Sequence, residues 1–151
     1  MRYRSLLLLC LGFVILFSAC SKDPNRVNNN YNGTGAGVLS AYINGYSWYA
    51  STGYAQLDNT QKLTLFAKYS QDNDISLYVY PYSGPGTYQL NGLNTITYYE
   101  NGVTYSPING EINITYDNTN SIQGTFSSRL ISTSGSETLD FTNGQFNIPK
   151  Y

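Results

Sequence analysis

Apolar and polar residues alternate with a period of two along most of the chain after Gly37. The pattern is clearest in residues 62–70, where one face carries Leu63, Leu65, Ala67 and Tyr69. Successive side chains of a β-strand point to opposite faces, so this alternation predicts strands with one buried face. The same pattern predicts further strands at residues 39–43, 47–50, 54–57, 75–82, 87–90, 96–100, 103–106, 111–116, 121–132, 138–142 and 145–148. No segment has apolar residues at helical spacing over three turns, which favours antiparallel pairing without crossover helices.

Tight turns are predicted where Asn-Gly stands between two alternating runs. This dipeptide accepts the positive φ angles of a two-residue hairpin loop, and it has that position at 44–45, 101–102 and 143–144. About ten short, hairpin-linked strands are typical of a single antiparallel β-sandwich or closed barrel, and both remain open at this point. We expect its core to include inward-facing residues of the later strands: Ile112, Ile114, Tyr116, Phe126, Phe141 and Phe146.

The N-terminal stretch Leu6–Cys20 differs from the rest, because twelve mainly apolar residues follow a short basic segment. A membrane-spanning helix needs about 20 apolar residues, so this run fits the core of a secretory signal better than a permanent span. The small residues Ser18 and Ala19 before Cys20 resemble a bacterial lipobox, in which the cysteine thiol is acylated and becomes the mature N-terminus. We therefore expect lipidation of Cys20; an ordinary signal peptide that is cut nearby is the alternative.

These signals divide the chain into three parts. We expect a lipoprotein signal peptide at 1–19, a lipid-anchored cysteine and flexible tether at 20–36, and a β domain at 37–151. The tether is rich in Asn and Gly and lacks periodicity, which is typical of a flexible linker. The expected partner is thus a membrane, bound through the N-terminal lipid, and the expected location is the outer membrane or cell surface.

The amino-acid composition excludes several kinds of active site. The sequence has no histidine, and its two cysteines are Cys10 in the predicted signal and the predicted lipid-bearing Cys20. Mechanisms that need a histidine base, or a zinc ion held by histidine and cysteine, are therefore excluded. After the predicted signal, six basic residues stand against nine acidic ones, so we expect no nucleic-acid surface. We also expect no cofactor and no disulfide.

Carboxylates are the remaining groups with obvious chemistry. The segments 72–74 and 117–120 offer closely spaced oxygens, as a calcium loop does, but they lack its full ligand pattern and fit ordinary turns. We expect no metal site. Paired carboxylates hydrolyse glycosides without histidine, and the candidates are Glu100, Glu111, Asp117, Glu137 and Asp140. Most of them fall at predicted turns or on outward faces, so we expect a protein that is not an enzyme, with a small carboxylate-pair glycosidase as a lesser alternative.

A row of tyrosines is the most unusual feature of the predicted sheet. Tyr78, Tyr80 and Tyr82 recur at period two on the face opposite the apolar residues of their strand, and Phe66 of the preceding strand shares that face. Flat exposed aromatic rings bind sugar rings in many carbohydrate-binding modules. Tyrosine is also enriched at protein interfaces. This row is therefore our candidate ligand-binding surface.

Two structural alternatives apply to these aromatic residues. In the first, the tyrosine rings pack on neighbours across the strands and bind no ligand. In the second, the face that carries the tyrosines is the buried face of the sheet. Trp48 is a candidate second platform, although its place directly after a predicted hairpin fits a core position better.

Several short motifs together carry a resemblance. They are Ala41–Gly45 with Trp48, Gly84–Leu90, Gly110–Thr115, Ile122–Ser127 and Asn143–Ile148. Standing behind a lipobox and a polar tether, they resemble a family of Bacteroidetes lipoproteins of unknown function. The resemblance covers most of residues 37–151 and implies a location and a fold class. It implies no activity and no catalytic residues.

The sequence thus predicts a non-catalytic, lipid-anchored domain of the cell envelope that binds a glycan on a Tyr-rich sheet face. The alternative from another class is a structural or assembly subunit, in which the same aromatic strand binds a partner envelope protein.

Overall fold

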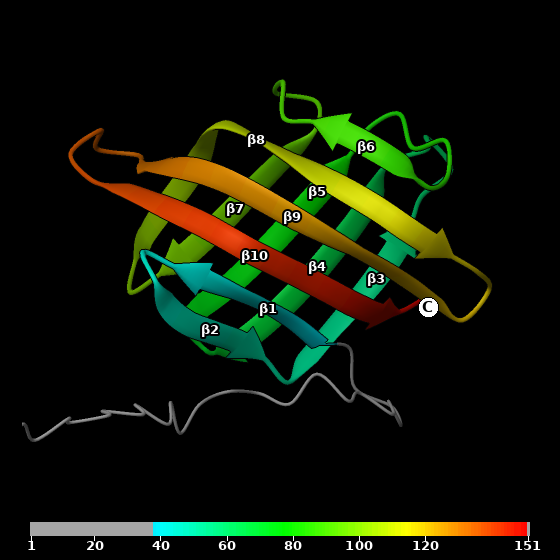
Figure 1. Cartoon of the computed structure of the whole chain (residues 1–151), viewed down its shortest axis with the longest axis horizontal. Coiled ribbons are helices and arrows are strands. Elements are labelled where there is room, and N and C mark those ends of the chain that lie inside the picture. Colours follow the sequence, from blue (N-terminus) through cyan, green and yellow to red (C-terminus); the bar gives the residue numbers. More distant parts are fainter. Residues whose placement is uncertain (1–37, 151) are drawn as a thin grey trace, which may run out of the picture.

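The computed structural model describes residues 38–150, and these form a single antiparallel sheet of ten strands (Figure 1). The strands are β1 (Val38–Ile43), β2 (Tyr46–Ala50), β3 (Thr52–Leu57), β4 (Leu63–Ser70), β5 (Asn73–Val79), β6 (Gly86–Gln89), β7 (Thr95–Glu100), β8 (Val103–Asp117), β9 (Ser121–Ser132) and β10 (Thr138–Pro149). Within this range no helix is long and apolar enough to span a bilayer. The predicted signal, lipidation site and tether lie outside the described residues.

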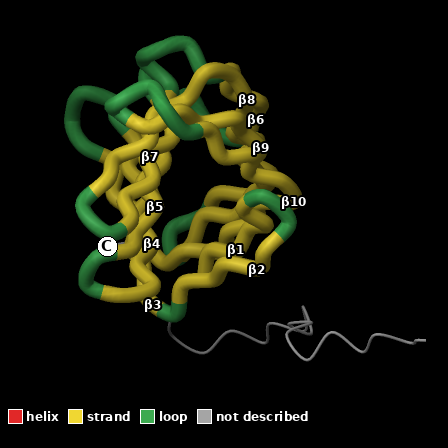
Figure 2. Tube along the Cα trace, turned by 90° about the vertical axis from the view of Figure 1, so that its left-hand side faces the viewer, coloured by secondary structure: helices red, strands yellow, loops and turns green. Residues whose placement is uncertain are grey.

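The sheet curls into a nearly closed barrel, which decides between the two predicted architectures. Its order is β2-β1-β10-β9-β8-β7-β5-β4-β3, with β6 paired to the second half of β8. The end strands β2 and β3 are consecutive in the chain, so the sharp corner at Ser51 brings the two edges of the sheet together. A parallel bridge from Ala55 to Lys150 joins β3 to the C-terminal end of the chain. Figure 2 shows β3, β4, β5 and β7 on one wall and β8, β9 and β10 on the opposite wall.

The barrel interior is filled by the inward faces of the strands, as the alternating pattern predicts. In β9 the inward positions Ile122, Gly124, Phe126, Ser128 and Leu130 are all buried, while their neighbours are more exposed. Phe141 and Phe146 of β10 are also buried, so the predicted core role of all three phenylalanines is confirmed. Aromatic side chains bury large areas and dominate core energetics.

Two of the three predicted Asn-Gly hairpins are confirmed. Asn44-Gly45 links β1 to β2 and Asn101-Gly102 links β7 to β8, and both residues of each pair have positive φ angles. Two consecutive positive φ angles are what a type I′ turn requires.

The third prediction is wrong, because Asn143-Gly144 lies in the middle of the continuous strand β10. Only Asn143 has a positive φ angle here, of 51°. Phe141 pairs with Ser128 and Gly144 with Phe126, so Thr142 and Asn143 together oppose the single residue Ser127. This is a β-bulge, in which one extra residue bends the strand and redirects its side chains.

Bulges also explain two errors in the predicted core. Tyr69 lies at a register shift between Lys68 and Ser70, and Tyr116 lies just after one between Ile114 and Tyr116. An extra residue reverses the alternation of faces. Both tyrosines are therefore exposed instead of buried.

Candidate functional site

An aromatic face, made of Tyr54, Phe66 and Tyr78, lies on the outside of β3, β4 and β5. Tyr54 pairs directly with Phe66 across the strands, and their ring centroids lie 5.2 Å apart with an angle of 31° between the planes. Tyr78 pairs with Thr64 and is therefore a diagonal neighbour of Phe66, at a spacing that aromatic rings can bridge. The residues beside them in the strands point inward and are fully buried: Ala55, Leu65 and Leu77.

Charged side chains lie at two edges of the aromatic face. The ammonium group of Lys62 lies 4.7 Å from the ring centroid of Tyr78, which is a cation–π contact. At the other edge Lys68 pairs across the strands with Asp74. Burial raises the pKa of the Asp74 carboxyl, and the positive charge of Lys68 partly opposes this. Because Lys62 covers one side of Tyr78, Tyr54 and Phe66 form the more open part of the face.

The structure brings together only two of the predicted site residues. Phe66 and Tyr78 share the outward face as the sequence indicates. Tyr54 was not among the predicted residues, and it is 40% exposed beside Phe66. The alternation in residues 54–57 predicts that Tyr54 points outward. Only the pairing of β3 with β4 shows that Tyr54 lies beside Phe66.

The predicted row of three tyrosines does not continue beyond Tyr78. Strand β5 ends at Val79, and Pro81 lacks the N–H group that a further ladder would need. Tyr80 is exposed after the end of the strand, and its backbone N–H donates to Oδ1 of Asn94.

Tyr82 is 7% exposed, so its predicted place on the outward face is wrong. Its phenol donates to Oδ2 of Asp117 at 2.6 Å, and Asp117 also pairs with the ammonium group of Lys150. Burial and this hydrogen bond raise the pKa of Tyr82 far above its usual range.

Trp48 is 8% exposed and belongs to the core, in agreement with the core alternative for this residue. Its indole N–H donates to Oδ1 of Asn73 at 2.6 Å. The amide of Asn73 in turn donates to the phenol oxygen of Tyr98 and to Oε1 of Glu100, at 3.1 Å each. This network occupies the polar edge of the tryptophan, so the ring is not a surface platform.

Two of the five candidate carboxylates, Glu100 and Glu137, lie near each other and near the hydrogen-bond network of Trp48. The phenol of Tyr105 donates to Oε2 of Glu137 at 2.8 Å, and its ring lies 5.8 Å from that of Tyr98, which contacts the Glu100 network. Burial, the bond to Glu137 and the negative charges of Glu137 and Glu100 raise the pKa of Tyr105 to about 12. Both carboxylates thus already accept hydrogen bonds from side chains of the chain.

The other three carboxylates lie apart from this pair. Asp117 pairs with Lys150, Asp140 lies 3.6 Å from the exposed guanidinium of Arg129, and Glu111 accepts a hydrogen bond from Gln89. In residues 38–150 no three acidic or sulfur ligands gather to hold a metal ion. In the turn at 117–120, the side-chain oxygen of Asn118 accepts backbone N–H groups instead.

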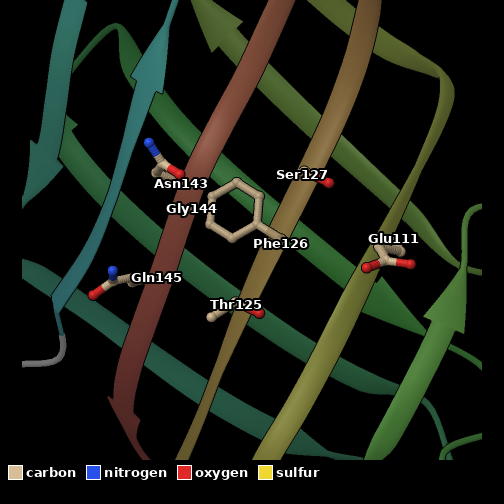
Figure 3. Close-up of a pocket in the computed structure, with 7 residues that line it drawn as sticks. All are labelled: Glu111, Thr125, Phe126, Ser127, Asn143, Gly144 and Gln145. Carbon is tan, nitrogen blue, oxygen red and sulfur yellow. The ribbon is translucent and has the colours of Figure 1, made fainter.

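A polar hollow is the second surface feature, on the opposite wall of the barrel (Figure 3). It has a volume of about 260 Å³ and lies over β8, β9 and β10. Its polar lining consists of Glu111, Thr125, Ser127, Asn143 and Gln145, around Phe126 and Gly144. These residues were not predicted to form one site, because their proximity depends on the register between three consecutive strands and on the bulge in β10.

Residues 36–149 match the model of a protein family described as a domain of unknown function (DUF6252). The chain belongs to this family. The DUF6252 match spans all ten strands, so the barrel is the family domain. This confirms the resemblance to a family of unknown function, whereas the lipid anchor and the bacterial group stay predictions. No curated protein and no solved structure matches the chain.

Proposed function

We propose that this DUF6252 protein is a non-catalytic domain of the cell envelope, anchored by a lipid on Cys20, that binds a glycan on its aromatic face. The observation that carries the proposal is the Tyr54–Phe66 pair. Its two rings lie 5.2 Å apart on an exposed sheet surface, at only 31° to each other. At this distance the two rings stack on each other with an offset, and the 40% exposed Tyr54 keeps part of its surface open, against which the C–H groups of a sugar ring can stack.

The surroundings of the Tyr54–Phe66 pair favour a sugar over a nucleic acid as the ligand. Neighbouring outward positions carry hydroxyl or amide groups, which suit the hydroxyls of a sugar: Gln56, Thr64, Thr95 and Thr97. A nucleic acid would need several cations, and only Lys62 contacts this face closely.

A depletion assay tests this proposal. The full chain, purified in a detergent without a sugar headgroup, is mixed with insoluble cellulose, chitin or peptidoglycan, and the protein left in solution is measured. We expect at least one material to remove the protein, and the double variant Tyr54→Ala/Phe66→Ala to remain in solution. Tyr116→Ala is the matched control, because it removes an exposed tyrosine from a different strand. Depletion of the double variant to the same extent as the native chain would refute the proposed site.

A partner protein is the second candidate, and a different observation favours it. β2 is an end strand that pairs only with β1 among the described strands. It carries two exposed tyrosines: Tyr46 is 80% exposed, and the ring of Tyr49 lies 5.7 Å from that of the exposed Tyr69 in β4. Unpaired edges are where an extended partner segment adds to a sheet. If a partner captured from envelope extracts is lost with Tyr46→Ala/Tyr49→Ala but kept with Tyr54→Ala/Phe66→Ala, the protein partner is the better assignment.

A further inference from the structure

The bulge in β10 creates the polar hollow. One extra residue in this strand, relative to both of its neighbours, leaves Asn143 in a left-handed conformation with its side chain on the surface. Gly144 follows, and its missing side chain leaves room for the ring of Phe126, which an added Cβ would approach to 2.6 Å. Bulges of this kind are common next to functional sites, because they redirect one side chain out of the regular alternation.

The lining of the hollow combines donors and acceptors from three strands. Figure 3 shows Asn143 and Gln145 on β10, Thr125 and Ser127 on β9, and Glu111 on β8. Glu111 is held in place by Nε2 of Gln89, which donates to its carboxylate at 2.8 Å. Two amides, two hydroxyls and one oriented carboxylate therefore face a single hollow. Each amide both donates and accepts, so the set matches a ligand with several hydroxyl groups.

Other ligand classes fit this lining poorly. No lysine or arginine lines the hollow, so a phosphate, sulfate or carboxylate ligand would find no countercharge beside Glu111. A calcium ion takes six to eight oxygen ligands and is usually held by more than one carboxylate, whereas one carboxylate is present. The volume of about 260 Å³ lies just below the range of about 300–1,000 Å³ that pockets for larger ligands span.

We propose that this hollow is a second binding site, which takes one neutral sugar ring and recognises it by hydrogen bonds to its hydroxyls. The site is independent of the aromatic face, because β8–β10 and β3–β5 lie on opposite walls of the barrel (Figure 2). It also works differently, since directed hydrogen bonds read individual hydroxyl groups, whereas stacking reads the C–H face of the ring. The ligand is thus a single residue, either free or at the end or branch of a glycan.

Amide-resolved NMR titration tests this assignment. Isotope-labelled full chain, in a detergent without sugar, is titrated with glucose, galactose, mannose, N-acetylglucosamine, xylose and fucose, one at a time. We expect one or a few of these sugars to shift the resonances of residues 125–127 and 143–145, with a dissociation constant of about 1 mM, as suits a small ligand in an open site. If none of the six sugars shifts these resonances at concentrations up to about 50 mM, the proposal is overturned, because a site that binds so weakly does not recognise a sugar.

Two variants separate recognition from nonspecific contact. Gln145→Ala removes one amide of the lining, and Asn147→Ala removes the next outward amide of the same strand, outside the hollow. We expect Gln145→Ala to weaken binding about tenfold, as the loss of one good hydrogen bond does, and Asn147→Ala to leave it within twofold. Equal weakening by both variants, or shifts confined to Tyr54, Phe66 and Tyr78, would overturn the second site. The latter result would leave the aromatic face intact as a proposal.

Discussion

Replacing Asn73 with alanine removes the side chain that links three strands at one end of the barrel. Its amide oxygen accepts from the indole N–H of Trp48 in β2, and its amide nitrogen donates to Tyr98 and Glu100 in β7. Trp48 and Tyr98 are both buried, so water cannot easily replace these contacts. We therefore expect Asn73→Ala to destabilise the fold more than the replacement of a small polar residue usually does.

The magnitude follows from which group loses its partner. The indole N–H of Trp48 becomes a buried donor without an acceptor, which costs about 1–3 kcal/mol. The bonds to Tyr98 and Glu100 add about 0.5–1 kcal/mol, because Glu100 is half-exposed and can bind water. We expect a total loss of about 1.5–4 kcal/mol from the free energy of unfolding. Since small domains have about 5–15 kcal/mol in all, this is a large fraction.

Urea unfolding of the full chain, followed by far-UV circular dichroism, measures this loss. In a Trp48→Phe background no indole N–H is left without a partner, so Asn73→Ala should then cost about 1–3 kcal/mol less than it does in the native chain. Asn113→Ala is the control, because its side chain makes a single exposed hydrogen bond of 3.3 Å, and we expect less than about 0.5 kcal/mol. A loss below about 0.5 kcal/mol for Asn73→Ala, or equal losses in both backgrounds, would refute the reasoning.

Three further predictions concern stability. Gly124→Ala should cost about 1–3 kcal/mol in urea unfolding, because the added Cβ would overlap a backbone carbonyl of β8 and lie 2.5 Å from Cζ of Phe146; a neutral result would contradict the close packing. Lys150→Ala should cost about 1–3 kcal/mol, because the mostly buried Asp117 loses its cation; an unchanged thermal midpoint would show that the pair contributes nothing. Between pH 10 and 12 the unfolded chain releases the proton of Tyr105 while the native chain keeps it, so stability should fall as pH rises. Tyr105→Phe should make that fall shallower in unfolding experiments at each pH, and an unchanged slope would contradict the raised pKa.

The alternation of apolar and polar residues predicts most of the fold because it depends only on local spacing. Asn44-Gly45 and Asn101-Gly102 were placed correctly, since each stands where a strand must reverse. Asn143-Gly144 looks identical at this level, but the chain continues straight through it. The inward residues Phe141 and Gly144 are separated by three positions, an odd spacing within one strand that is itself typical of a bulge.

The candidate sites were harder to predict because each depends on the register between strands. Phe66 and Tyr78 belong to consecutive strands with a short turn, so their common face follows from the sequence. Tyr54 joins them only through the pairing of β3 with β4, which the sequence does not specify. Tyr82 was misplaced because Pro81 ends the ladder and the chain then turns inward. The polar hollow needs three strands and a bulge, so no local pattern indicates it.

The central claim is that the stacked rings of Tyr54 and Phe66 bind a glycan, and affinity electrophoresis tests it most directly. The full chain is run in native gels, with a detergent lacking sugar, through increasing concentrations of soluble plant, host and bacterial polysaccharides. Beside it runs Tyr54→Leu/Phe66→Leu, which keeps an apolar surface but removes the rings. The account predicts that at least one polysaccharide retards the native chain and that the leucine variant, with an unchanged thermal midpoint, migrates as if no polysaccharide were present. Equal retardation of both proteins, or no retardation of the native chain in any gel, would contradict the claim.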